Sequence, residues 1–248
     1  MHESRSSAGV PLEPDVPPYQ VVLAETDWGS LQTAFGSGED LPDVLARLLE
    51  PDPKIQVTAL SELGEMVNHQ GTIYGATAPV ALYVAGILTH PAAANLRAYG
   101  DVPIRATLLN WLVSTAYDAS DEIAGPIEQR FPGFLTHGTT MASFRDLRPM
   151  LYRAVAPFVQ DSHENVREAA VVAALILAEH PALAEQRDHL AVHTRRVLDT
   201  NGHEPDRRIA RRALEAWGHD VPGPGPFRAE PWDRGPHRDG RGDLEPPF

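Results

Sequence analysis

The sequence predicts an all-α fold, and three observations lead to this prediction. Apolar residues recur every three to four positions through most of residues 40–218, which is the spacing of one face of a helix. Turns that contain Asp or Pro separate the periodic segments and supply signals for helix starts. Alternating apolar and polar runs, which are typical of β-strands, are nearly absent.

The first two periodic segments show how the helices are assigned. Residues 40–50 place leucines and a valine on one face, with Asp40 as the expected N-cap. In the next helix, which runs to residue 69, Asp52 is the expected cap and Pro53 the first helical residue, where its missing N–H costs little. Further helices are expected over residues 78–90, 100–120 (capped by Asp101), 144–161, 163–180, 181–200 and 204–218, with a break at 120–143.

Alternate helices resemble one another. Gln56, Arg105, Arg167 and Arg207 share one register within Ile-Gln-x-x-Ala, Ile-Arg-x-x-Leu, Val-Arg-x-x-Ala and Arg-x-x-Ala. This pattern resembles the second helix of HEAT repeats, in which an Asp/Pro turn precedes Val-Arg-x-x-Ala. The aligned positions are 49, 62 and 40 residues apart, whereas HEAT periods are about 40–47 residues. The long interval therefore predicts an insertion, which we assign to residues 120–143.

Three fragments strengthen the resemblance: Trp28-Gly-Ser-Leu, Asp40-Leu-Pro-Asp-Val-Leu and His69-Gln-Gly-Thr-x-Tyr-x-Ala-Thr-Ala-Pro. Together they resemble a set of HEAT-repeat proteins common in actinobacteria. The resemblance implies an α-α superhelix, or solenoid, of about four helical pairs over residues 26–218. It implies a fold and no reaction.

The two ends of the chain have a different composition. Residues 1–25 are rich in Pro, and residues 219–248 are rich in Pro and Gly, so we expect a disordered leader and a disordered tail. The N-terminus lacks the apolar segment of a secretory signal, and no apolar run is long enough to span a bilayer. We therefore expect a cytoplasmic protein without a membrane segment. The absence of Cys excludes disulfides and thiolate metal sites.

Charge is distributed unevenly along the chain. The net charge is −13, and residues 1–124 hold sixteen acidic and five basic side chains, against eighteen and sixteen in residues 125–248. Such an acidic protein repels the phosphates of nucleic acids. A nucleic acid partner is therefore unlikely on this ground, and a protein partner or basic peptide is expected.

The HEAT-like register predicts the residues of a concave groove. Its second helices place Glu62, Glu65 and His69 outward, followed by Trp111 and Asp118. We expect these side chains to form an acidic groove with an exposed Trp111 as an anchor for the partner. The helix at 163–180 is apolar almost all round and must be covered, either by the insertion at 120–143 or by a partner.

The stretch NHQGTIYGATAPV, residues 68–80, predicts a joint between two helical pairs. Gly71 is expected to end one helix in a left-handed conformation. Thr72 or Thr77 is expected to cap the next, with Pro79 in its first turn. His69, Gln70 and Tyr74 have no such structural assignment, so they are candidates for contact with a partner as well as for a structural role.

Two other clusters suggest ligands. Glu185, His189 and His193 are spaced for one face of a helix and are weak candidates for a metal site; an exposed polar face is the alternative, and we expect no metal or cofactor. The last helix carries a cluster that suggests an anion patch, or else arginines that pair with Glu204, Asp206 or Glu215. This cluster comprises Arg207, Arg208, Arg211 and Arg212.

These observations favour a non-enzymatic protein-binding scaffold or regulator, of the adaptor or immunity-inhibitor type. One alternative is an enzyme of HEAT-like fold acting on a small molecule or nucleic acid through His69 or the 185–193 face. The other is a small-molecule sensor with a pocket under the 120–143 insertion.

Overall fold

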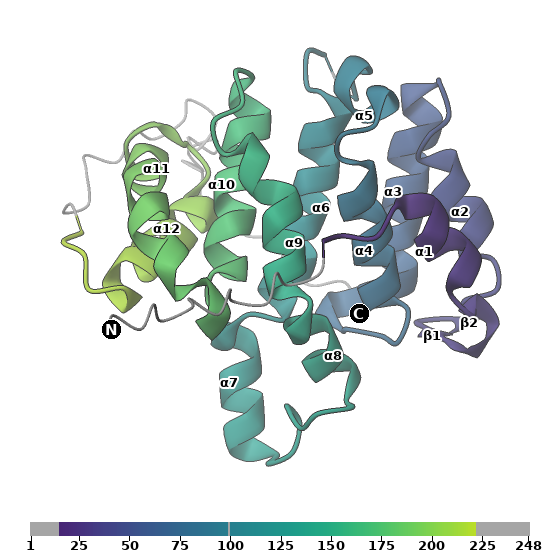
Figure 1. The fold of residues 1–248 in the computed structure, drawn as a ribbon, viewed down its shortest axis with the longest axis horizontal. Helices are drawn as coiled ribbons and strands as arrows, with labels where there is room; N and C mark the ends of the chain where they lie inside the picture. Colours follow the sequence, from purple (N-terminus) through teal and green to yellow (C-terminus); the bar gives the residue numbers. More distant parts are fainter. Residues whose placement is uncertain (1–14, 99, 222–248) are drawn as a thin grey trace, which may run out of the picture.

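The computed structural model describes residues 15–98 and 100–221 (Figure 1). The prediction of an all-α fold is confirmed, since the described strands, β1 (Gln32–Thr33) and β2 (Gly36–Ser37), form just one short antiparallel hairpin. The α-helices are α1 (Tyr19–Glu25), α2 (Leu41–Arg47), α3 (Pro53–Val67), α4 (Thr77–Ile87), α5 (Pro91–Asn95), α6 (Ile104–Asp118), α7 (Asp121–Arg130), α8 (Thr140–Asp146), α9 (Arg148–Val155), α10 (Glu164–Leu177), α11 (Arg187–Thr200) and α12 (Glu204–Ala216). Short 3-10 helices are η1 (Trp28–Ser30), η2 (His69–Gly71), η3 (Ala156–Phe158) and η4 (Pro181–Gln186).

The helices pack as stacked pairs. Helices α3, α6, α10 and α12 follow one another in space as they do in the chain, each packing against the next. Their partners within each pair are α2, α4, α9 and α11, and the succession from α2 and α3 to α11 and α12 is visible across Figure 1. This arrangement is compatible with a helical repeat, and the four helices aligned by sequence are the four that form the continuous row.

Two of the aligned residues, Arg105 and Arg167, make equivalent hydrogen bonds to backbone carbonyls in successive pairs. The guanidinium of Arg105 donates from Nε to the carbonyl of Leu88 (2.8 Å), and that of Arg167 donates from Nη1 to the carbonyl of Asp161 (2.8 Å). Each arginine therefore ties its helix to the end of the helix or turn before it. Gln56 is buried at the equivalent position of α3, but its amide has no hydrogen-bond partner among the protein groups.

Helix α10 is the centre of the core, as its apolar sequence indicates. Every residue from Ala169 to Ala178 is buried. The cover is formed by α6, α9, α11 and α12, so the expectation that the 120–143 insertion provides it is wrong. A helix in the middle of a two-layer stack has neighbours on both sides and behind, and these neighbours bury its whole circumference.

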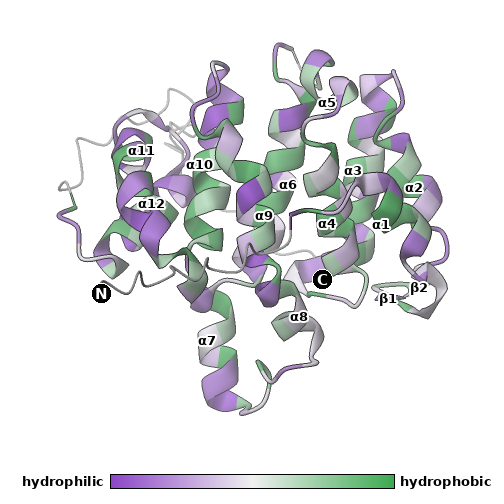
Figure 2. Cartoon of the chain, in the orientation of Figure 1, coloured by the Kyte–Doolittle hydropathy of each residue, from purple (hydrophilic) through white to green (hydrophobic). Residues whose placement is uncertain are grey.

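The insertion instead projects from the body of the molecule. Helices α7 and α8 extend below the stacked pairs in Figure 1. Apolar and polar residues alternate around α7 in the hydropathy view (Figure 2), and Phe131 at its end is 60% exposed. The fragment 131–139 between the two helices is fixed in part by Glu128, whose carboxylate accepts hydrogen bonds from the backbone N–H groups of Gly133 and Leu135.

Several predicted boundaries and caps differ from the structure. Helix α1 lies within the range expected to be a leader, and Tyr19 packs edge-on against Tyr83. Asp52 caps α3 as expected, accepting a hydrogen bond from Lys54 N–H (2.9 Å). Asp40 precedes α2 without a capping hydrogen bond, and Asp101 does not cap α6, because the helix begins at Ile104 with Pro103 in the cap position.

The described helices include none with both the length and the apolar character needed to cross a membrane. Residues 222–248, which make up most of the expected tail, lie outside the described residues, as do residues 1–14 of the expected leader.

Candidate functional site

The joint at residues 68–80 has an unusual backbone. Helix α3 ends at Val67, and the turn η2 follows with Gln70 at φ 51° and Gly71 at φ 72°. The left-handed conformation of Gly71 confirms that prediction, although the helix itself ends earlier, with Asn68 as its C-cap. Gln70 is the one described residue other than glycine with positive φ. Such a conformation costs free energy for a residue with a Cβ, so the presence of glutamine instead of glycine at position 70 requires an explanation.

Thr77 holds the joint together from the inside. Its buried hydroxyl accepts a hydrogen bond from Tyr74 N–H (2.8 Å) and donates one to the carbonyl of Val67, which the end of α3 leaves without a helical partner. The expectation that Thr77 or Thr72 is the N-cap of α4 is wrong, because Thr77 is the first helical residue and Ala76 occupies the cap position. Thr77 therefore joins two helices instead of capping one.

Asp118 closes the joint from the neighbouring pair. The amide of Asn68 donates from Nδ2 to Asp118 Oδ2 (2.9 Å). Asp118 Oδ1 faces Gly71 so closely that a Cβ atom added to this glycine would lie 3.1 Å from the oxygen. Burial raises the pKa of Asp118 above the ordinary aspartate value, and the hydrogen bond from Asn68 opposes this rise without cancelling it. Asp118 is thus a packed structural contact of the joint, and it contributes less to an open groove than we expected.

The β-hairpin also rests on the joint. Ala34 N–H donates to the carbonyl of Met66 (2.8 Å), and Ala76 N–H donates to the carbonyl of Gln32 (3.1 Å). These bonds hold the hairpin loop so that the ring of Phe35 lies 5.6 Å from the ring of His69, centroid to centroid. Phe35 is 70% exposed. Sequence reasoning missed this residue, and the signal that was present is an aromatic residue directly before glycine in a short polar stretch.

The carboxylates of the predicted groove are already partnered. Glu65 Oε2 lies 2.9 Å from His69 Nδ1, and Glu62 Oε2 lies 2.6 Å from Arg47 Nη2. Both pairs are partly exposed, so each stabilises the fold only weakly. The Glu65–His69 pair leaves the Nε2 atom of His69 for other contacts. Tyr74 is half-buried in the same joint.

Trp111 does not line an open groove. The side chain is 8% exposed and its Nε1 has no hydrogen-bond partner among the protein groups. The exposed positions of α6 are instead Asn110 and Ser114. Because α6 packs against α3 on one side and α10 on the other, only a narrow part of its surface is exposed to solvent. A small error in the predicted helix register therefore places a residue in the core that was expected on the surface.

The candidate metal residues do not share one helix. Glu185 lies in η4, whereas His189 and His193 lie in α11 with their rings 5.4 Å apart, edge to face. Within residues 15–98 and 100–221, no group of three His, Cys, Asp or Glu side chains is arranged to hold a metal ion. The distance between the two rings reflects packing of neighbouring turns.

Two arginines of α12, Arg207 and Arg212, pair with carboxylates, and only Arg207 pairs with one of those expected. Arg207 pairs with Glu204 (3.6 Å), Arg208 donates to the hydroxyl of Tyr117 (3.1 Å), and Arg212 contacts both Glu122 and Glu179. Arg211 also has an interaction partner.

Arg212 belongs to a charged junction, partly buried around Arg148, that is formed by Asp121, Arg145, Arg148, Glu179 and Arg212. Arg148 is 3% exposed, and its Nη1 lies 3.5 Å from Glu179 Oε2 and 3.6 Å from Asp121 Oδ1. Glu179 Oε2 also accepts a hydrogen bond from Asp121 N–H (2.7 Å). Burial raises the pKa of Glu179 in spite of these partners. The junction connects the starts of α7 and α9 with α8, the end of α10 and α12, which makes it structural.

A pocket opens beside this junction, between the ends of α6, α10 and α12. It is a small cavity of about 40 Å³ that is partly open to solvent. Most of its lining is apolar, but Ser120 is fully buried there and its hydroxyl has no hydrogen-bond partner among the protein groups. The lining residues are Tyr117, Ser120, Leu175, Ile176, Glu179, Ile209, Arg212, Ala213, Ala216 and Trp217.

No protein-family model matches the chain, and the searches of curated proteins and of solved structures find no match either. The candidate sites therefore rest on the geometry of this chain alone.

Proposed function

We propose that the chain is a non-enzymatic HEAT-like α-solenoid that binds a basic segment of another protein. The contact surface, which we call the joint surface, comprises Phe35, Glu65, His69 and Gln70. The observation that carries this proposal is Phe35, a largely exposed aromatic side chain on a hairpin that is fixed to the joint by backbone hydrogen bonds.

The chemistry of the joint surface supports this proposal. A large aromatic side chain in a fixed position loses little entropy on binding, and such residues supply much of the affinity of protein interfaces. Glu65 lies one turn from His69, and this half of the molecule has far more acidic than basic residues. A partner with Arg or Lys beside an apolar residue matches both features, since guanidinium groups stack on aromatic rings and pair with carboxylates.

The test is selection from two displayed peptide libraries, one rich in Arg and Lys and the other in Asp and Glu. We expect enrichment from the basic library and binding that weakens with added salt. Phe35→Ser is expected to lower the affinity for the selected peptides by about tenfold or more, because it removes an aromatic anchor of the interface. Phe131→Ser is the matched control, because Phe131 is a comparably exposed aromatic residue far along the chain, on the insertion.

Two results contradict the proposal. One is that selected peptides bind the Phe35→Ser variant as tightly as the unmodified protein. The other is equal loss of binding in Phe35→Ser and Phe131→Ser, which indicates general hydrophobic adhesion. The charge part of the proposal fails separately if Glu65→Lys leaves the affinity for basic peptides unchanged.

A second candidate function, sensing of a small molecule, is favoured by the pocket beside the charged junction. An apolar lining with one unpartnered buried hydroxyl is typical of sites that orient a small ligand. Native mass spectrometry of the purified protein tests this function. A co-purified ligand that is lost in Ala213→Trp, which fills the pocket, supports sensing; a ligand retained by that variant places it elsewhere.

A further inference from the structure

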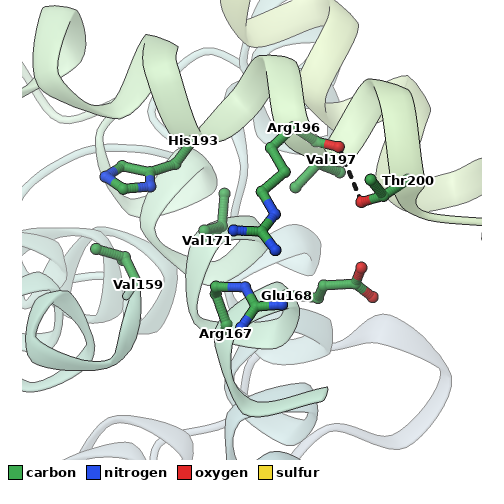
Figure 3. A pocket seen from close by; sticks show the side chains of 8 residues that line it. All are labelled: Val159, Arg167, Glu168, Val171, His193, Arg196, Val197 and Thr200. Atoms are coloured by element: carbon green, nitrogen blue, oxygen red, sulfur yellow. Dashed lines mark hydrogen bonds between the residues drawn. The ribbon is translucent and has the colours of Figure 1, made fainter. Parts of the chain in front are cut away.

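Three basic side chains line a second pocket, between α10 and α11. The guanidinium groups of Arg167 and Arg196 lie close together, and the imidazole of His193 lies at the other side of the pocket (Figure 3). Arg167 comes from α10, and the other two come from α11. The complete lining is Val159, Arg167, Glu168, Val171, His193, Arg196, Val197 and Thr200.

The approach of two guanidinium groups is unfavourable unless an anion lies between or beside them. Arg167 is held in place because its Nη1 donates to the carbonyls of Asp161 (2.8 Å) and Ser162 (3.4 Å). Arg196 is exposed and lies on α11, one turn after His193. The pocket therefore combines one fixed cation with one that is free to adjust its position.

Glu168 is the one acidic residue among the eight that line the pocket. Burial raises its pKa, as does the nearby Glu164, and the opposing effects of Arg167 and Arg196 do not overcome this rise. In Figure 3 its carboxylate lies to one side of the two guanidinium groups. Glu168 thus compensates part of the positive charge, and two arginines against one carboxylate leave the lining with a net positive charge even when His193 is neutral.

We propose that this pocket binds the anionic group, a carboxylate or a phosphate, of a small molecule, with Arg167 and Arg196 as its hydrogen-bond donors. Guanidinium groups bind both oxyanions with paired hydrogen bonds. Val159, Val171 and Val197 form the apolar part of the lining. This site is independent of the joint surface and of the α12 arginines, of which Arg207, Arg208 and Arg212 have carboxylate or hydroxyl partners.

His193 makes binding depend on pH. Burial lowers its pKa, and so do His189 and Arg196 on its own helix; across the pocket, α10 presents Arg167 and Glu168. An anion bound beside His193 favours the protonated imidazole, so affinity for the anion increases as pH falls.

The experiment is titration of the full chain with sodium phosphate and, separately, with sodium acetate, at constant ionic strength set by chloride. Backbone amide NMR shifts report the site. We expect saturable shifts confined to α10 and α11 near the pocket. Stronger binding of phosphate assigns a phosphoryl ligand and stronger binding of acetate assigns a carboxylate; either result supports the site.

Two variants on α11 make the test specific. Arg196→Gln is expected to weaken anion binding by about tenfold, since it removes charge-assisted hydrogen bonds. Arg195→Gln, which removes the same charge from the adjacent exposed residue outside the pocket, is the matched control and is expected to leave binding unchanged. With acetate, which stays ionised over this range, the affinity of the unmodified protein is expected to increase from pH 8 to pH 6, and His193→Gln is expected to abolish this increase.

The proposal is overturned if neither anion gives saturable shifts. It is also overturned if Arg195→Gln and Arg196→Gln weaken binding equally, because the effect is then one of overall charge. Both arginine positions are exposed on α11, so neither substitution is expected to unfold the chain.

Discussion

The ends of α3 and α6 are stabilised in two different ways. The joint after α3 is held mainly by uncharged groups: the hydroxyl of Thr77 bonds to the backbone on both sides, and the amide of Asn68 reaches Asp118. The junction after α6 is held by charged groups, with Arg148 buried between Asp121 and Glu179. Both connect neighbouring helical pairs.

The difference has a physical consequence for stability and for function. A buried ion cluster costs much desolvation, so the loss of one member leaves the others uncompensated. An uncharged hydroxyl costs less to bury, and its loss leaves only two backbone groups unpaired. The uncharged joint also has polar and aromatic side chains at its surface. Phe35 and Gln70 are among them, and both remain exposed in the folded chain.

The largest effect is expected at the charged junction. Arg148→Met keeps most of the side-chain volume but removes the cation between Asp121 and Glu179. We expect a loss of about 3 kcal/mol in the free energy of unfolding, measured by urea denaturation, because the largely buried carboxylate of Glu179 loses a buried partner, while the half-exposed Asp121 contributes little. Arg97→Met is the control: its partner Asp101 is almost fully exposed, so a change within about 1 kcal/mol is expected. Equal effects contradict the comparison.

A smaller effect is expected in the uncharged joint. Thr77→Val preserves shape and removes the hydroxyl that joins Tyr74 N–H to the carbonyl of Val67, so we expect a loss of about 2 kcal/mol by the same measurement. Thr58→Val, which removes an exposed hydroxyl bonded to its own helix, is expected to change stability by less than about 0.5 kcal/mol. A Thr77→Val variant as stable as the unmodified protein means that the joint does not depend on this hydroxyl.

The strained backbone of the joint is expected to give a gain. Gln70→Gly relieves the left-handed conformation and should raise the free energy of unfolding by about 1 kcal/mol. Gln70→Ala retains a Cβ and should leave stability unchanged. If Gln70 belongs to the joint surface, the stabilised glycine variant also loses affinity for the basic peptides. A glycine variant that is less stable than the alanine variant shows that the side chain itself stabilises the joint.

The smallest effect concerns pH. Burial raises the pKa of Asp118, so the folded state binds this proton more tightly than the unfolded chain does. Stability from this group is therefore complete below the ordinary aspartate pKa and is lost as pH rises through the higher folded pKa. Asp118→Asn should remove that part of the pH dependence, measured by urea denaturation from pH 3 to pH 8. Asp199→Asn, at an exposed position of α11, should keep it.

Features that depend on neighbouring residues in the chain were predictable. The Asp52–Pro53 start of α3 and the left-handed Gly71 are determined within a few residues. The burial of α10 follows from a sequence with no polar face for ten residues. The register of Arg105 and Arg167 identified the helices that stack, because the same residue repeats the same contact with the preceding segment.

Predictions that depended on how wide a face each helix exposes were wrong. Trp111 was expected in a groove and is buried, since α6 has packing partners on two sides. The carboxylates of Glu62 and Glu65 are partly exposed, but they also pair with Arg47 and His69, contacts that the sequence did not predict. Glu185 was expected on the same helix as His189, but it lies in the 3-10 turn η4, which ends before α11 begins.

The sequence by itself determined the all-α class, the succession of helical pairs and the place of the joint, because helix periodicity and turn chemistry are local. Only the tertiary structure decided which side chains remain accessible. It placed Phe35 beside His69, Arg212 beside Glu122, and Arg167 opposite Arg196, pairs that come from separate elements of the chain. No local pattern specifies such pairs, since they arise from the angles and offsets at which the helices stack.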